Sequence, residues 1–529
     1  MKLTGLLFAA ALLGTCTQPA AEENYTRHVD PKIGTGGHGH VFVGANVPFG
    51  LVQVGPTSIP QTWDWCSGYH ASDSTVIGFS HTHLSGTGIG DLFDVTVMPV
   101  TGEVTYARGT EDDPTSGLWS YADRTQEIAR PGYYSVPLTR YGIRAELTAT
   151  ARVGLHRYTF PASDAAAVVF DLENGGCWDK ATETHLAKEG DRTVTGWRHS
   201  TGWAKDQRVY FAAEFSKPFE KFETIGDNYA RASFRTTDGE QVSLKVALSP
   251  VSVEGARENL AAELPGWDFE ETAKAADKAW NDELSKVKIE TEDETSKRIF
   301  YTALYHTMVA PSLFCDVNGD YYGSDHAIHR NADFTNYTTF SLWDTYRAAM
   351  PLMTVLHPEK MADIVQTMLT ISDEQGRLPV WHLWGNETDC MVGNPGIPVV
   401  ADAIVKGIGG FDREKAFEAI RKTAMNPDRG NGLRMEYGYI PCEMFNEAVA
   451  YDMEYALADG AAARAAETLG KAEDAKYFEE RSHSYRNYFD PATRFMRGRD
   501  SKKGWRTPFN AFASTHRADD YCEGNAWQY

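Results

Sequence analysis

The hydrophobic periodicity of the chain changes near residue 265, and this change limits the folds that it can adopt. At positions 143–155 the apolar residues occupy every second position, the repeat of a strand with one buried face. After Pro265 they recur every three to four positions, the repeat of an amphipathic helix. Further strands are predicted before this change, at 167–172, 209–215 and 242–248. The sequence therefore predicts an N-terminal β-sandwich followed by a helical domain.

Helical patterns in the second half alternate with short connections. Helices of roughly 10 to 20 residues joined in this way pair as antiparallel hairpins, and a ring of six such hairpins is an (α/α)6 toroid or barrel. Such a ring needs about twelve helices by the same rule, more than the patterns supply. We therefore expect the barrel to be incomplete and truncated within this sequence. The predicted helices are 295–309, 344–356, 359–371, 399–408, 413–423, 447–469 and 474–488.

The length of 529 residues is too great for one ordinary core and fits two large domains. We predict a signal peptide at 1–21, a β-sandwich domain at 22–265, a helical linker at 266–290 and a catalytic barrel domain at 291–529. We expect no strands within the helical part.

The N-terminus has the layout of a bacterial export signal. Lys2 precedes an apolar run at 6–13 that is too short to span a bilayer. Residues 13–16 (LGTC) resemble a lipoprotein cleavage box ending at Cys16, and ordinary cleavage near residue 20 or 21 is the alternative. We expect an exported protein, periplasmic or a cell-surface lipoprotein, with no transmembrane segment. Its oligomeric state and cysteine pairing stay open.

The net charge of -22 would repel nucleic acid and anionic lipid, so a neutral ligand suits this chain better. Two segments combine the side chains that bind sugars. Residues 63–70 (WDWCSGYH) place three aromatic rings and an acid in one loop, and residues 343–347 (WDTYR) repeat the combination. A pyranose offers an apolar face to tryptophan and hydroxyl pairs to a carboxylate or guanidinium. The alternative is that Asp344 only caps a helix and Trp343 only fills the core.

Two glutamates are candidates for acid catalysis. Glu387 lies in residues 385–391 (GNETDCM) and Glu523 in residues 522–529 (CEGNAWQY), each beside glycine and asparagine. Glycoside hydrolysis needs a protonated carboxylic acid at the leaving oxygen and a carboxylate that activates water.

Other motifs are better explained as structure. Residues 33–40 and 86–90 are glycine-rich but lack the spacing of nucleotide-binding loops. His81 and His83 could bind zinc, but a pair without a third ligand is more often hydrogen-bonded. Residues 316–320 (DVNGD) begin like a calcium loop and lack its glycine and closing carboxylate, so a turn is predicted.

Taken together, these motifs resemble glycoside hydrolase family 92, the calcium-dependent exo-α-mannosidases. The resemblance implies a β-sandwich packed on an (α/α)6 barrel with the active site between them. It also implies inverting removal of terminal α-linked mannose from N-glycans or mannans. We expect an α-1,2 linkage, and the sequence leaves α-1,3, α-1,4 and α-1,6 open. The matching blocks are residues 29–31, 33–40, 63–70, 78–88, 340–347, 385–388, 495–499 and 523–529.

The resemblance also implies site residues. Glu523 corresponds to the general acid, and Trp343 and Asp344 to the floor and hydroxyl clamp of the mannose subsite. Trp65 and Cys66 correspond to the pocket wall, and Arg347 with Glu387 to its supporting shell. Gln528 is implied as a ligand of Ca²⁺, with most ligands expected from later helices.

The sequence also departs from the family. The family's general base lies in a downstream Gly-Asn-Asp-Asp or Gly-Asn-Glu-Asp block, which does not occur before Tyr529. We therefore expect these 529 residues alone to be inactive. Two alternatives remain: another barrel enzyme, such as a glycoside phosphorylase, and a noncatalytic glycan-binding protein of the cell surface.

Overall fold

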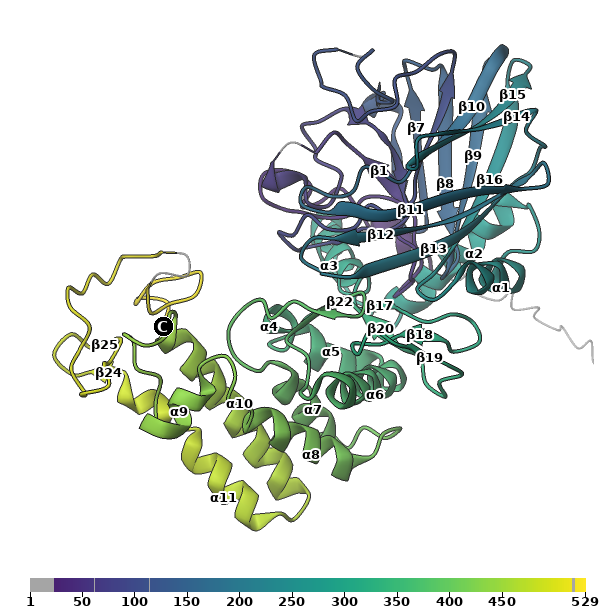
Figure 1. Cartoon of the computed structure of the whole chain (residues 1–529). Helices are drawn as coiled ribbons and strands as arrows, with labels where there is room; N and C mark the ends of the chain where they lie inside the picture. The colour runs from purple at the N-terminus through teal and green to yellow at the C-terminus, as the bar shows by residue number, and fades with distance from the viewer. Residues whose placement is uncertain (1–22, 61, 114, 516–518) are drawn as a thin grey trace, which may run out of the picture.

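The structure is a computed structural model that describes residues 23–60, 62–113, 115–515 and 519–529. Figure 1 shows a β-sheet-rich N-terminal part above a helical C-terminal part, as predicted. The predicted signal peptide and Cys16 lie outside the described residues.

The N-terminal part is built on two antiparallel sheets. The six-stranded sheet has the order β1 (Gly55–Thr57), β3 (Gly78–Ser80), β4 (Thr96–Thr101), β10 (Ser163–Asp171), β15 (Tyr229–Thr236) and β14 (Lys221–Ile225). The eight-stranded sheet has the order β11 (Lys180–Glu189), β12 (Thr193–Thr201), β13 (Gln207–Phe215), β16 (Glu240–Ser249), β9 (Val153–Phe160), β8 (Ile143–Ala149), β7 (Tyr133–Leu138) and β6 (Ile128–Arg130). A small pair is formed by β2 (Thr75–Val76) and β5 (Ser120–Tyr121).

Apolar side chains of both large sheets share one core. Phe170 of β10 stacks on Phe211 of β13 with ring centroids 6.0 Å apart, and Phe215 meets Phe234 of β15 at 5.3 Å. All four rings are buried. Burial of this area is the main force that holds the sheets face to face.

The single strand predicted at 143–155 was wrong, because the chain turns back within it. β8 ends at Ala149 and β9 begins at Val153, and the two strands pair with each other. The connecting turn is held by Glu263, whose carboxylate accepts hydrogen bonds from Thr150 Oγ1 and the Arg152 backbone. The alternation of apolar residues continues through a tight hairpin, so periodicity alone does not reveal the turn.

The helical part contains longer and more broken elements than predicted. Two helices at the junction are α1 (Val253–Glu263) and α2 (Phe269–Leu284), and α1 was not predicted. The predicted helix at 344–356 is broken into α4 (Leu342–Thr345) and α5 (Ala349–Leu356). The other helices are α3 (Glu294–His306), α6 (Pro358–Gln375), α7 (Gly396–Val405), α8 (Arg413–Ala424), α9 (Asn431–Tyr437), α10 (Ala448–Thr468) and α11 (Ala472–Arg481). The long helix α10 packs against α7, α8 and α11.

Short strands interrupt these helices, contrary to the prediction. The pairs are β17 (Ser312–Leu313) with β20 (Tyr337–Thr338), β18 (Tyr321–Tyr322) with β19 (Ile328–His329), and β24 (Phe489–Asp490) with β25 (Phe495–Met496). A three-stranded sheet joins β21 (Phe340–Ser341), β22 (Trp381–Leu383) and β23 (Asn386–Glu387). Elements of two or three residues are too short to give a period, so the sequence did not reveal them.

A buried histidine chain crosses the sandwich core. His81 Nδ1 lies 2.6 Å from the Val95 carbonyl, so this nitrogen carries the proton and His81 Nε2 is an acceptor. His156 Nε2 therefore donates to His81 Nε2 at 2.9 Å, and His156 Nδ1 accepts from the Tyr158 hydroxyl at 2.7 Å. Burial lowers the pKa of His81 to about 3. The expected hydrogen-bonded role of this motif fits these contacts.

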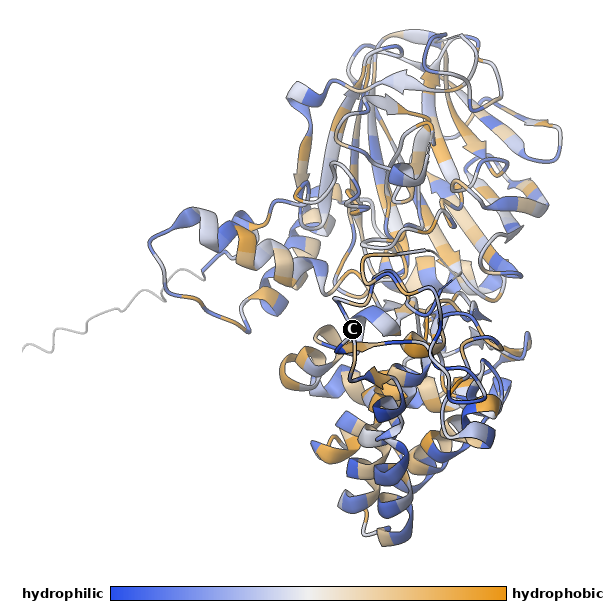
Figure 2. Cartoon of the chain, turned by 90° about the vertical axis from the view of Figure 1, so that its left-hand side faces the viewer, coloured by the Kyte–Doolittle hydropathy of each residue, from blue (hydrophilic) through white to orange (hydrophobic). Residues whose placement is uncertain are grey.

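Figure 2 shows hydrophobic and hydrophilic residues interleaved along the helices of the second part. None of the described helices is both long and apolar enough to cross a membrane. The six cysteines in the described ranges are free thiols.

Candidate active site

A cavity of about 1250 Å³ lies between the two parts of the chain. It exceeds the roughly 300 to 1,000 Å³ of a typical small-molecule site, so it has room for more than one sugar unit. The sandwich contributes His40, Trp63, residues 86–89 and Trp203. The helical part contributes Ser341, Asp344, Trp381, residues 388–391, residues 443–447, Tyr451, Cys522 and Glu523.

Trp63 forms the sandwich side of this cavity. Its indole Nε1 donates to the Gly88 carbonyl at 2.8 Å, and its ring meets His40 edge-on at 4.2 Å. The side chain keeps 46% of its surface exposed, so one ring face is open to a ligand. Asp64 pairs with His38, and that hydrogen bond lowers the pKa of Asp64.

Two further tryptophans lie against each other in the wall. Trp203 of the sandwich meets Trp381 of β22 edge-on, with ring centroids 4.9 Å apart. The backbone of Trp203 is held by Asp91, whose carboxylate accepts from the N–H groups of Trp203 and Ala204 at 3.0 and 2.8 Å. Burial raises the pKa of Asp91 to about 6. Thus a buried carboxylate fixes an aromatic ring at the domain junction.

Glu387 fixes the other tryptophan. Its carboxylate accepts backbone hydrogen bonds from Val380, Trp381 and Asp389 at 2.8, 2.9 and 2.9 Å. These bonds close the β22–β23 hairpin around one side chain. The carboxylate is therefore engaged with the backbone of the loop that lines the cavity.

Glu523 lies on the last described turn and is exposed to the cavity. Its φ of 48° is in the left-handed region, which costs energy for a non-glycine residue and persists only where the surroundings enforce it. The Tyr529 hydroxyl supplies that constraint. It accepts from the Cys522 N–H at 3.2 Å and donates to the Cys522 carbonyl at 2.9 Å.

Other carboxylates also face the cavity. Asp344 accepts from Ser341 Oγ at the start of α4. Glu443 accepts from the backbone and hydroxyl of Ser501, and although burial opposes it, these bonds lower the pKa of Glu443. Asp389 is ion-paired with Arg377. Glu447 has 8% of its surface exposed and lines the same cavity.

Three other predicted residues are not among those that line the described cavity. Trp65 donates to Asp73 Oδ2 at 2.7 Å, and Cys66 is fully buried. Trp343 packs in a cluster with Val392, Ala450 and Cys522.

Arg347 and Gln528 each have a partner outside the described cavity lining. Arg347 pairs with Glu454 at 2.6 Å and lies over the Trp343 ring. Gln528 Oε1 accepts the Asn525 N–H at 2.9 Å, within the turn that follows Glu523. Of the predicted site residues, Asp344 and Glu523 are the two that line the described cavity.

Several lining residues were not among the predicted site residues. Trp63 belongs to the motif at 63–70, but which ring of that motif faces the cavity depends on local backbone direction. Trp381 lies four residues before the motif at 385–391. Trp203, Glu443 and Glu447 come from segments without a recognisable sugar-binding pattern, so their position follows only from the packing of the two parts.

Comparison with protein families gives two adjoining matches. Residues 28–249 match the glycosyl hydrolase family 92 N-terminal domain, and residues 255–529 match the family 92 catalytic domain. The division between them falls at the loop between β16 and α1.

Solved structures and a curated relative agree with this assignment. The family GH92 alpha-mannosidase BT3965 from Bacteroides thetaiotaomicron, in complex with mannoimidazole, is 40% identical with a TM-score of 0.93, covering 96% of this chain and 70% of that one. The family GH92 inverting mannosidase BT2199 of the same organism is 29% identical with a TM-score of 0.86, covering 97% and 71%. An uncharacterized secreted glycosidase of Arthroderma benhamiae is 26% identical over 91% of this chain, which spans 64% of that relative's length. This chain belongs to glycosyl hydrolase family 92.

Proposed function

We propose that the protein is an exported exo-α-mannosidase that removes terminal α-linked mannose, most readily α-1,2-linked, from N-glycans or mannans with inversion. The observation that supports this most is the meeting of Glu523 and Asp344 in a cavity walled by tryptophans, in a chain of family 92. The secreted relative supports export.

In the proposed reaction Glu523 protonates the departing glycosidic oxygen. Inverting hydrolysis separates this acid from a carboxylate base by roughly 6.5 to 9.5 Å, which leaves room for the attacking water. Asp344 is proposed to hold sugar hydroxyls, because a carboxylate accepts hydrogen bonds from a vicinal pair. Trp343, Trp65 and Cys66 then support the subsite from behind, and Arg347 and Glu387 hold its frame.

Calcium fits the donor chemistry of this region. The carboxylates of the cavity and the amide oxygen of Gln528 are hard oxygen donors, the type that Ca²⁺ prefers. Gln528, in the turn that follows Glu523, is the ligand proposed from this chain. Bound calcium would polarise the sugar hydroxyls and favour a distorted ring.

The proposal is tested by mannose release from α-1,2-mannobiose, with and without EDTA. The assay is run on this chain and on a longer version that carries the downstream block implied by the resemblance. Calcium-dependent release of free mannose by the longer version, lost in Glu523→Gln, is expected. Release of mannose phosphate only when phosphate is added would instead favour a phosphorylase. Binding of mannosides by a longer version that never hydrolyses them would favour a noncatalytic glycan-binding protein.

A further inference from the structure

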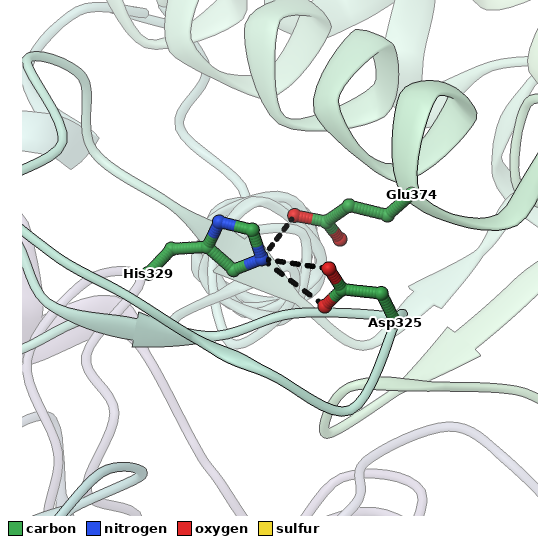
Figure 3. Close-up of side chains that lie close together, drawn as sticks. All are labelled: Asp325, His329 and Glu374. Atoms are coloured by element: carbon green, nitrogen blue, oxygen red, sulfur yellow. Dashed lines mark hydrogen bonds and ion pairs between the residues drawn. The ribbon is translucent and has the colours of Figure 1, made fainter.

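A second constellation of ligand-type side chains lies on the β18–β19 hairpin, outside the described cavity lining. Asp325 and His329 come from the hairpin and Glu374 from the last turn of α6 (Figure 3). His329 Nε2 is 3.1 Å from both carboxylate oxygens of Asp325 and 3.4 Å from Glu374 Oε1. One imidazole N–H can be directed at only one of these three oxygens. Asp325 Oδ1 also accepts the Ala327 N–H and Glu374 Oε1 the Tyr321 hydroxyl, each at 3.0 Å, and each carboxylate oxygen has a second lone pair that a cation can use.

The spacing of these atoms is close to that of ligands around one small divalent cation. Zinc binds nitrogen and oxygen ligands at about 2.0 to 2.2 Å, so the edge of a zinc tetrahedron is about 3.3 to 3.6 Å. The distances of 3.1 and 3.4 Å are close to that edge, and the three ligand atoms lie within 4.8 Å of one another. A single ion can therefore reach all three side chains after small rotations.

Glu374 and His329 are oriented by hydrogen bonds and a ring contact. The Tyr321 hydroxyl donates to Glu374 Oε1 at 3.0 Å, and the Ser324 N–H donates to Oε2 at 2.7 Å. His329 stacks on Tyr321 with ring centroids 4.9 Å apart and planes 9° from parallel. Partners of this kind fix the orientation of metal ligands in established sites. The cluster is therefore held in place before any ion binds.

The backbone leaves space at the point where the ligands converge. A Cβ added at Gly323 would lie 2.6 Å from Asp325 Oδ1 and 2.7 Å from His329 Nε2. The φ of Gly323 is outside the left-handed region, so its conformation does not require glycine. Because Gly323 has no side chain, the ligand atoms stay accessible to an ion.

Burial and charge also favour a cation. The Glu374 side chain is 6% exposed, so its carboxylate is largely shielded from water. A divalent ion would offset this buried negative charge. The Asp325 and His329 side chains keep 36% and 35% of their surface exposed, so water can complete the coordination shell from that side.

We propose that Asp325, His329 and Glu374 bind a zinc-type divalent cation that fastens the β18–β19 hairpin to α6. One imidazole with two carboxylates suits Zn²⁺, whereas Ca²⁺ takes oxygen ligands. The site is thus separate in position and chemistry from the calcium proposed above. Its role is structural: Tyr322 of the same hairpin donates to Asp206 of the sandwich at 2.9 Å, so the ion would secure a segment that bridges both parts.

The test is zinc binding to the EDTA-treated, dialysed protein by calorimetry, with the melting temperature measured in parallel. We expect one Zn²⁺ per chain that raises the melting temperature, and at least a tenfold loss of affinity in His329→Ala and in Glu374→Gln. Glu374→Gln keeps the volume of the side chain, and its melting temperature without zinc, measured in the same experiment, shows whether it is folded. His326→Ala is the matched control on the same hairpin and should retain the zinc-dependent shift.

Cobalt provides an independent readout, because bound Co²⁺ gives intense visible absorption in a tetrahedral site. We expect that absorption in the wild-type protein and its loss in His329→Ala. Absence of zinc binding, or equal zinc affinity in wild type and both site variants, would overturn the proposal and show that the cluster is only an ion pair. Displacement of Zn²⁺ by millimolar Ca²⁺ would overturn the assigned metal class. None of these readouts depends on mannosidase activity.

Discussion

Replacing Glu387 by glutamine should loosen the wall of the cavity without changing its shape. The Glu387 carboxylate accepts from the N–H groups of Trp381 and Asp389 through Oε1 and from Val380 through Oε2. A glutamine has one acceptor oxygen, so in its better orientation it keeps the two Oε1 bonds and turns its NH₂ group against the Val380 N–H. The change therefore removes the bond from the Val380 N–H to a charged acceptor, together with a longer one from Gln375 Nε2 at 3.4 Å, and creates a contact between two donors.

The loss of such a bond costs roughly 1.5 to 3 kcal/mol, and the unpaired Val380 donor keeps the Glu387→Gln penalty toward the upper part of that range. For a domain of 150 to 250 residues, about 1 kcal/mol corresponds to roughly 2 to 4 °C in melting temperature. We expect the helical part to melt about 4 to 12 °C earlier in Glu387→Gln. Because β22 carries Trp381, the affinity for a mannoside should fall as well.

The assay combines calorimetric melting with titration of methyl α-mannoside at 20 °C. Glu414→Gln is the control, since Glu414 is 67% exposed and only pairs with Lys471. Its effect should stay within about 0.5 kcal/mol. A Glu387→Gln protein that melts and binds like this control would refute the argument that the carboxylate supports the wall.

Three other changes test different parts of the structure. The pKa of His81 is lowered to about 3, so its neutral form stabilises the fold fully above the unfolded value of 6.5, and that stability is lost as pH falls toward 3. The free energy of unfolding of the sandwich, measured in urea, should fall by about 2 kcal/mol between pH 6.5 and 5 because of His81, at about 1.4 kcal/mol per pH unit. His81→Gln should remove this part of the pH dependence. Trp63→Ala should weaken binding of a mannoside by about 1 to 2 kcal/mol, seen in calorimetry, with little change in melting, because this ring is half exposed. Tyr529→Phe removes both hydrogen bonds to Cys522. In the longer version that carries the downstream block, it should lower kcat at least tenfold while KM changes less. Equal falls in melting temperature and in mannoside affinity would instead indicate general unfolding.

The sequence predicted the two halves of the fold because their periodicities differ over long segments. It did not place the hairpin turn at 150–152, because the apolar alternation continues on both sides of it. It also missed α1 and the short sheet that contains Trp381 and Glu387. Two- and three-residue strands are defined by partners distant in the chain, and a single sequence does not identify those partners.

The candidate site was predicted at the level of motifs and less well at the level of single side chains. Glu523 and Asp344 line the described cavity. In residues 63–65, Trp63 lines it while Trp65 turns back to bond Asp73. Which of two rings in one short helical turn faces a ligand depends on the direction of that turn, and residue type does not encode it. Trp203 has no motif at all and is placed by Asp91.

The contacts of the residues at 385–388 explain why these residue types occur next to one another. Gly385 has a φ of 78° and no room for a side chain, since a Cβ would lie 2.6 Å from the Tyr322 ring. Asn386 then pairs with the Asp206 backbone on both sides, accepting from its N–H and donating to its carbonyl at 3.0 Å each.

Asn386 therefore joins the sandwich to the sheet, while Glu387 beside it holds the tryptophan that the same sheet carries. The spacing between Trp203 on one part and Trp381 on the other depends on this junction. A sugar pocket shared between two domains needs such a fixed junction, because its walls are otherwise free to move apart. The motif thus supports the site mainly through geometry, because of its four residues only Thr388 lines the described cavity.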